Sequence, residues 1–280
     1  MPSLPDFDTI RFELDGLIGR LVLDRPDKLN SFTIAMWREM RELGELLLAD
    51  PGELRALIVV GEGRAFSSGI DTSVFAEGTG GDQIADEGSE KPAHDDPVVN
   101  GILATQEAFT WLEEAPFVTI AAVRGYAFGA GLQLALACDL RVMARGTKMG
   151  LLELQYGILP DLGGTQRLTR LVGPGRAKEM IFTRAKIDAD DAERFGIAEH
   201  VVPDEELEEV ARTLAETIAA QPPIAVRGAK RAIAVAIEGG SVRDGLLAEA
   251  EGQADCMRSD DMKEAITAFI EQRDPVYRGT

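Results

Sequence analysis

The sequence of 280 residues is poor in cysteine and histidine, with two of each. Cys138 lies in an apolar segment and Cys256 in a distant one, so we expect neither a disulfide framework nor a metal site. No apolar run is long enough to cross a bilayer, and the N-terminal segment MPSLPDFDTI lacks a signal-peptide pattern. We therefore expect a cytoplasmic protein that does not associate with membranes.

Positive charge is also scarce. Lysine and arginine total 29 against 48 aspartates and glutamates, which gives a formal net charge of −19. Nucleic-acid binding depends on lysine and arginine displacing counterions from phosphates, so this balance argues against a nucleic-acid partner. An anionic ligand would have to bind at a local basic patch.

What the sequence does contain is a series of short apolar runs separated by helical patterns. The predicted strands are residues 10–14, 18–23, 54–60, 118–123, 140–144 and 200–203, and the turn at Asp15-Gly16 joins the first two as a hairpin. Ser31 or Thr33 is expected to cap the first helix. From Asp204, which we expect to cap the next helix, the pattern is helical only. We predict an α/β core over residues 1–203 and a helical oligomerisation region over residues 204–280.

The stretch from Val118 to Asp139 is the centre of this pattern, because it combines a buried strand, a glycine-rich turn and the start of a helix. The turn contains Gly125, Gly129 and Gly131. A helix that begins there has backbone N–H groups without intrahelical partners, and these could hold a developing negative oxygen. The alternative is that the glycines only permit close packing of helix on strand.

Residues Glu77 to Pro97 form an acidic, glycine-rich segment that is expected to be a mobile surface loop. His94 within it is expected to be solvated and without a catalytic role, and His200 to be structural.

Several motifs together resemble the crotonase superfamily of enoyl-CoA hydratases and isomerases. They are Arg25-Pro-Asp-Lys-Leu-Asn30, Phe66-Ser-Ser-Gly-Ile-Asp71, Gly125-Tyr-Ala-Phe-Gly-Ala-Gly131, Glu153, Pro160-Asp-Leu-Gly-Gly-Thr-Gln-Arg-Leu168 and Ala189-Asp-Asp-Ala192 with Gly196. The resemblance implies a spiral of ββα units and C-terminal helices that build a homotrimer or a dimer of trimers. It also implies an acyl-CoA thioester substrate, so that coenzyme A is part of the substrate and no separate cofactor is expected.

By the same resemblance, the thioester carbonyl would accept hydrogen bonds from the backbone N–H groups of Ser68 and Ala130. Lys28 and Leu29 would border the adenine end of coenzyme A. Gly69, Ile70 and Asp71 would line the channel that leads from there to the reacting carbons.

The residues at the positions of the family's catalytic acid and base indicate which reaction to expect. Family hydratases have a glutamate at the positions of Gln133 and Glu153. Glutamine has no proton to exchange near neutral pH, so Gln133 is expected to bind and orient the substrate by hydrogen bonds and not to act as a base. Asp161, eight residues beyond Glu153, is a second carboxylate that could move a proton, although Pro160-Asp161 could also be a simple turn. The sequence therefore favours a double-bond isomerase that uses Glu153 and Asp161. A hydratase and a non-catalytic acyl-CoA binding protein are the alternatives.

Overall fold

A computed structural model describes residues 4–76 and 94–280 of the chain. Its elements in chain order are β1 (Ile10–Asp15), β2 (Ile18–Leu23), η1 (Pro26–Lys28), α1 (Ile34–Ala49), β3 (Ala56–Gly61), α2 (Ser73–Ala76), α4 (Pro97–Glu114), β4 (Val118–Val123), β5 (Tyr126–Phe128), α5 (Ala130–Ala137), β6 (Leu140–Ala144), β7 (Lys148–Gly150), η2 (Glu153–Tyr156), α6 (Gly164–Thr183), β8 (Ile187–Asp188), α7 (Ala189–Phe195), β9 (His200–Val202), η3 (Asp204–Glu206), α8 (Leu207–Ala219), α9 (Pro223–Ile237), α10 (Val242–Arg258) and α11 (Asp260–Glu271).

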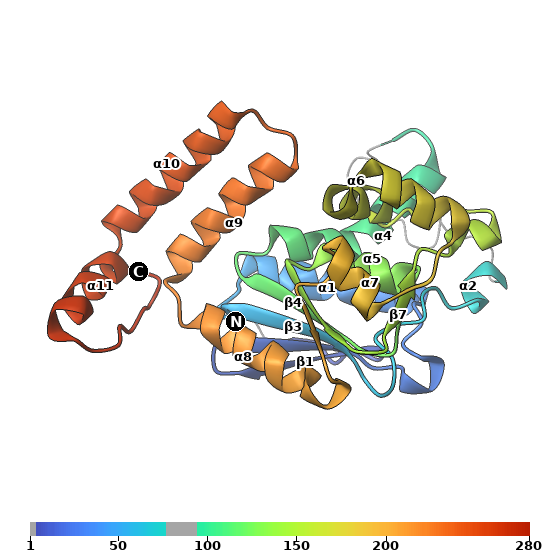
Figure 1. The fold of residues 1–280 in the computed structure, drawn as a ribbon, viewed down its shortest axis with the longest axis horizontal. Helices are drawn as coiled ribbons and strands as arrows, with labels where there is room; N and C mark the ends of the chain where they lie inside the picture. The colour runs from blue at the N-terminus through green and yellow to red at the C-terminus, as the bar shows by residue number, and fades with distance from the viewer. Residues whose placement is uncertain (1–3, 77–93) are drawn as a thin grey trace.

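A six-stranded sheet in the order β1-β2-β3-β4-β6-β9 forms the centre of the molecule (Figure 1). β1 and β2 are the antiparallel hairpin expected from Asp15-Gly16, and every later pairing in this sheet is parallel. All six residues of β3 are buried, as their continuous apolar sequence predicts for a strand covered on both faces. A second sheet consists of β5, β7 and β8, and β5 lies within the glycine-rich turn between Gly125 and Gly129.

Helices cover both faces of the large sheet. On one face α1, α4 and α5 bury the larger apolar cluster, which includes Phe32, Phe66 and Phe109. On the other face α8 packs Leu207, Ala211 and Ala215 against strand residues such as Ile58 and Ile120. The compact body therefore extends through α8, beyond the last strand.

The C-terminal helices α9, α10 and α11 extend away from this body (Figure 1). The described residues after Asp204 contain no strand. Lys230, in the middle of α9, holds this helix to the body, because its Nζ donates to the carbonyls of Leu112 and Phe117 and lies 2.8 Å from Asp139 Oδ2. No helix among the residues that the structure describes is long and apolar enough to cross a membrane.

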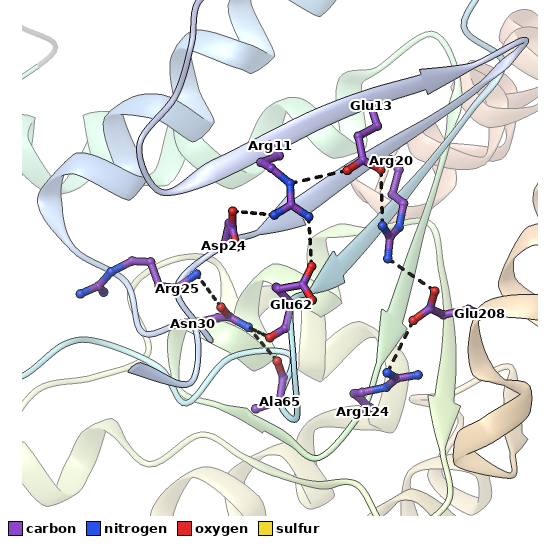
Figure 2. Close-up of polar contacts among 10 residues, drawn as sticks. All are labelled: Arg11, Glu13, Arg20, Asp24, Arg25, Asn30, Glu62, Ala65, Arg124 and Glu208. Atoms are coloured by element: carbon purple, nitrogen blue, oxygen red, sulfur yellow. Dashed lines mark hydrogen bonds and ion pairs between the residues drawn. The ribbon is translucent and has the colours of Figure 1, made fainter. Parts of the chain in front are cut away.

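Charged side chains on β1, β2, α8 and the neighbouring loops form a chain of ion pairs (Figure 2). Arg11 lies 2.6 Å from Asp24 and 3.0 Å from Glu62, and the chain continues through Glu13, Arg20, Glu208 and Arg124. Because most of these side chains are well exposed to solvent, each pair contributes about 0–1 kcal/mol to stability.

Two local predictions from the sequence need correction, and part of one of them lies outside the described residues. Asp204 does not cap α8, because the turn η3 comes first and Glu206 is the residue before the helix. The predicted loop from Glu77 to Pro97 ends one residue earlier, because α4 begins at Pro97 with Asp96 as its cap through a bond from the Val98 N–H. Residues 77–93 of the predicted mobile loop lie outside the described residues. Thr33, one of the two expected caps, does accept a hydrogen bond from the Met36 N–H.

Candidate active site

The segment from Phe66 to Asp71 runs between two neighbouring stretches of backbone. On one side Ser67 N–H donates to the Tyr126 carbonyl of β5 at 2.9 Å, and Phe128 N–H donates to the Ser67 carbonyl at 3.1 Å. On the other side the segment pairs with residues 29–32. Phe32 N–H donates to the Gly69 carbonyl, and Asp71 N–H donates to the Phe32 carbonyl.

This pairing decides which amides remain available for a ligand. Ser68 N–H donates to the Leu29 carbonyl at 2.9 Å, so the amide that the sequence resemblance assigned to the thioester is already engaged. Bonds on a strand alternate in direction, so the amide of Ile70 points away from residues 29–32. It makes no hydrogen bond to any described residue. In the structure the available backbone donor of this segment is therefore the Ile70 amide and not the Ser68 amide.

Asn30 holds residues 29–32 in the shape that this pairing requires (Figure 2). Its side-chain nitrogen donates to the carbonyls of Glu62 and Ala65, and its Oδ1 accepts from the Arg25 N–H. Leu29 and Asn30 both have positive φ angles, 50° and 53°. Such backbone costs about 1–3 kcal/mol per residue when unsupported, so the fully bonded amide of Asn30 stabilises a strained loop.

Asp71 ends the segment as a fixed carboxylate. Burial opposes its charge, but hydrogen bonds from the Ser73 backbone and side chain, from Arg25 and from Ser31 hold the pKa of Asp71 at about 2. Its side chain therefore anchors the loop as an anion. Lys28, in contrast, is exposed at the end of η1.

The second available amide lies at the start of α5. Gly129 precedes the helix with φ 51° and ψ −120°, and Ala130 is the first helical residue. The Ala130 N–H has no hydrogen-bond partner among the described residues, as expected for the first turn of a helix. The whole of α5 is buried, so this donor sits in surroundings where its interaction with a negative oxygen is strong.

Two glycines bring the two free amides together. A side-chain carbon added to Gly129 would lie 3.9 Å from the Gly69 Cα, and one added to Gly69 would lie 2.8 Å from the Phe128 carbonyl oxygen. The backbones therefore approach more closely than side chains would allow. Ile70 and Ala130 each follow one of these glycines, so their amides lie where the two backbones approach each other.

Glu153 lies beside that position. The same added carbon on Gly129 would be 3.4 Å from Glu153 Oε1. The side chain is buried, with 8% exposed, and Oε1 accepts a hydrogen bond from Gln133 Nε2 at 2.7 Å, whereas Oε2 is buried without a partner. Burial raises the pKa of Glu153 to about 7, against hydrogen bonds from its own backbone and Gln133, and the charge of Asp161 raises it further.

Asp161 is half-buried on the turn before α6, and Gln106 Nε2 donates to its backbone carbonyl at 2.6 Å. Burial raises the pKa of its carboxyl. The structure thus places Gln133, Glu153 and Asp161 in one neighbourhood, while Lys28 and Leu29 lie on the loop that supports the Ile70 segment. No cluster of His, Cys, Asp and Glu within residues 4–76 and 94–280 could hold a metal ion.

Two free amides beside a buried carboxyl with a pKa near neutrality are the parts needed to stabilise an enolate and move a proton. The model of the family described as enoyl-CoA hydratase/isomerase matches residues 15–280. The chain belongs to this family.

Relatives of known name agree with this assignment. A probable enoyl-CoA hydratase of Mycobacterium bovis is 35% identical over 274 residues, covering 97% of this chain and 98% of the relative. A putative enoyl-CoA hydratase from Streptomyces coelicolor has a solved structure with a TM-score of 0.88 and 31% identity, covering 100% and 98% of the two chains. The structure of a putative enoyl-CoA hydratase from Thermobifida fusca in complex with CoA has a TM-score of 0.77 and 34% identity, covering 94% and 95%.

The predicted family and fold are therefore confirmed. This enoyl-CoA hydratase/isomerase family enzyme has the crotonase-like α/β fold with C-terminal helices. Named relatives are mostly hydratases, and one is named as an isomerase/hydratase. The names thus favour hydration, the alternative to the double-bond isomerisation that the sequence favoured.

Proposed function

We propose that this chain adds water to the double bond of a 2-enoyl-CoA thioester, with Glu153 as the group that carries the proton. The observation that carries the proposal is the buried, unpaired Oε2 of Glu153 beside the two free amides. The predominance of hydratases among the named relatives supports water addition over the isomerisation that the sequence favoured.

The amides of Ile70 and Ala130 would hold the thioester oxygen. Addition to the third carbon of the acyl chain moves an electron pair through the second carbon onto that oxygen, which becomes an enolate. Fixed backbone donors stabilise this charge without reorganising, and loss of one such donor typically costs about 2.7–4 kcal/mol of transition-state stabilisation. Ser68 supports this arrangement indirectly through its bond to the Leu29 carbonyl.

One carboxyl is enough for the proton balance. Ionised Glu153 takes a proton from water as the water oxygen bonds to the third carbon. The same proton then passes to the second carbon, the enolate collapses to the thioester, and Glu153 is again ionised. A group with a pKa of about 7 is suited to both steps, because neither protonation state is strongly disfavoured near neutral pH.

Double-bond isomerisation is the second candidate, and Asp161 is the observation that favours it. Glu153 would remove a proton from the second carbon of a 3-enoyl-CoA, and Asp161 would deliver one to the fourth carbon. The half-buried Asp161 carboxyl, whose pKa burial raises, is the second carboxyl beside Glu153 that could exchange a proton.

Incubation of the purified protein with a 2-enoyl-CoA and, separately, with a 3-enoyl-CoA distinguishes the candidates. We expect 3-hydroxyacyl-CoA from the 2-enoyl substrate, measured by loss of the conjugated thioester absorbance and by mass spectrometry. We also expect Asp161→Asn to retain most of this hydration. If the 3-enoyl substrate is converted and the 2-enoyl substrate is not, the chain is an isomerase. Binding without turnover of either would make it an acyl-CoA binding protein.

The remaining proposals concern the rest of the substrate and the assembly. We propose that Lys28 and Leu29 border the adenine end of coenzyme A, and that Gly69 to Asp71 line the channel. We also propose that α9 to α11 pack on other copies of the chain in a homotrimer or a dimer of trimers. The exposed side chains that support this are Ile233, Ile237, Leu246, Leu247, Met257, Ile266, Phe269 and Ile270. A monomeric mass by light scattering at micromolar concentration would exclude it.

A further inference from the structure

Gln133 is a buried glutamine whose side chain connects three elements of the site. It projects from α5, and its Nε2 donates to Glu153 Oε1 of η2 at 2.7 Å. Its Oε1 accepts from the N–H groups of Leu162 and Gly164 at 2.8 and 2.9 Å, where the turn that carries Asp161 leads into α6. Only 1% of the residue is exposed, so water does not compete for these bonds.

These contacts permit a single orientation of the Gln133 amide. The N–H groups of Leu162 and Gly164 both require an acceptor, and rotating the amide by half a turn would point its own NH2 group at them. The amide nitrogen must therefore face Glu153. Gly164 also begins α6, whose preceding residue offers no side-chain cap, so Gln133 Oε1 satisfies an N–H that the helix leaves open.

The orientation of the Gln133 amide determines which oxygen of the Glu153 carboxyl is free and which protonation form of that carboxyl is favoured. A donor on Oε1 fixes the plane of the carboxyl and leaves Oε2 as its free atom. A hydrogen bond to the ionised form favours that form over the protonated one. The charge of Asp161 acts in the opposite direction and raises the pKa of Glu153.

We infer that Gln133 is a positioning residue that fixes the Glu153 carboxyl with Oε2 free for the substrate and, through its bond to Oε1, favours the ionised form of that carboxyl. The inference rests on the proposed function for what Oε2 does. It gives the glutamine a role of its own, in which its neutral amide acts through Glu153 and exchanges no proton itself.

Gln133→Met tests this inference, because methionine has a similar length and volume but neither accepts nor donates strongly. Loss of a hydrogen bond to a charged group costs about 1.5–3 kcal/mol, so we expect the pKa of Glu153 to rise by about one to two units. In the pH profile of kcat/KM, the rising limb should move up by that amount. Turnover at pH 7 should fall about five- to fifty-fold, because that is the loss of ionised Glu153 for a shift of one to two units from about 7, and it should recover substantially near pH 9.

Gln106→Met is the matched control. Gln106 donates to the Asp161 carbonyl, so its loss loosens the same turn without removing a bond to Glu153. We expect the pKa of Glu153 to stay within about 0.3 units of the wild-type value in this variant, since no group bonded to Glu153 changes. If Gln133→Met lowers activity equally at every pH, or if both variants shift the pKa alike, Gln133 has only a packing role and the inference is wrong.

A second readout separates this inference from the proposed reaction. The Glu153 carboxyl can be titrated directly in the unliganded full-length protein by carbon NMR of ¹³C-labelled glutamate, with Glu153→Gln identifying the resonance. The expected shift in Gln133→Met does not depend on turnover. If the wild type hydrates no enoyl-CoA but the resonance shifts as expected, the proposed function is wrong and the positioning of Glu153 stands. If the wild type hydrates the enoyl-CoA but the Glu153 resonance is unshifted in Gln133→Met, the proposed function stands and the positioning role of Gln133 is wrong.

Discussion

Replacing Glu153 with glutamine should lower kcat for hydration by at least about a hundred-fold, because general acid–base groups contribute about 10²–10⁴-fold. Glutamine has nearly the same shape and can still accept the hydrogen bond from Gln133. It has no carboxyl to take a proton from water or return it to carbon. The Ile70 and Ala130 amides remain, so the KM for the 2-enoyl-CoA should change little. Steady-state kinetics at pH 7 to 8 give both constants.

The same variant should be more stable than the wild type at high pH, which shows that lost activity is not lost folding. The pKa of Glu153 is raised from 4.5 to about 7 in the folded state. The unfolded chain therefore loses this proton first, so folding stability falls as pH rises from about 4.5 to about 7. Removing the carboxyl should recover up to about 3 kcal/mol above pH 7 and almost nothing below pH 4.5. Thermal unfolding at pH 5 and pH 8 measures the difference.

Glu53→Gln is the control for charge, since Glu53 is exposed in the loop before β3. It should leave turnover unchanged. Retention of more than a tenth of wild-type kcat in folded Glu153→Gln would contradict the assignment of Glu153 as the proton carrier. The proton would then have to be carried by Asp161.

The sequence predicted the elements and the residues that meet at the site because both depend on local patterns. Continuous apolar runs identified the central strands, and glycines marked where the chain turns between β5 and α5. Glu153 and Gln133 were recognised from the family motifs. In the structure α5 and η2 bring them together, with Gln133 Nε2 donating to Glu153 Oε1 at 2.7 Å.

The donor in the Phe66–Asp71 segment could not be assigned from this pattern. Ser68 and Ile70 lie two residues apart, and both amides belong to the same extended segment. Which amide is free depends on hydrogen bonds to residues 29–32, almost forty positions earlier in the chain. That loop in turn depends on Asn30 contacts with Glu62 and Ala65. Non-local pairing of this kind sets the register and is absent from any single motif.

The role of α8 shows a second limit of the sequence pattern. The helical sequence pattern after residue 203 gives no reason to separate α8 from α9, α10 and α11. In the structure Ala211 and Ala215 allow α8 to lie close on the sheet, whereas α9 begins the part that extends away. Small residues on one helix face are compatible with packing on a sheet or on another helix, so only the assembled fold distinguishes them.

Gly69→Ala should reduce kcat by about a hundred-fold or more, because it separates the two amides that hold the thioester oxygen. Gly69 has φ +100°, which side-chain-bearing residues rarely adopt, and the added carbon would lie 2.8 Å from the Phe128 carbonyl oxygen. Neither backbone can yield without moving Ile70 away from Ala130. Loss of one donor in such a site costs about 10²–10³ in kcat, even when the substrate still binds.

Gly146→Ala provides the comparison that isolates this close approach from backbone strain. Gly146 has a similar φ of +90°, but no atom lies within 4 Å of the position that its added carbon would occupy. Both variants should lose about 1–3 kcal/mol of stability from the unfavourable backbone, as thermal unfolding will show. Only Gly69→Ala should lose turnover while Glu153 still titrates near pH 7. A folded Gly69→Ala enzyme with normal kcat would mean that the Ile70 amide does not hold the oxygen, and the donor would have to be sought elsewhere along Phe66–Asp71.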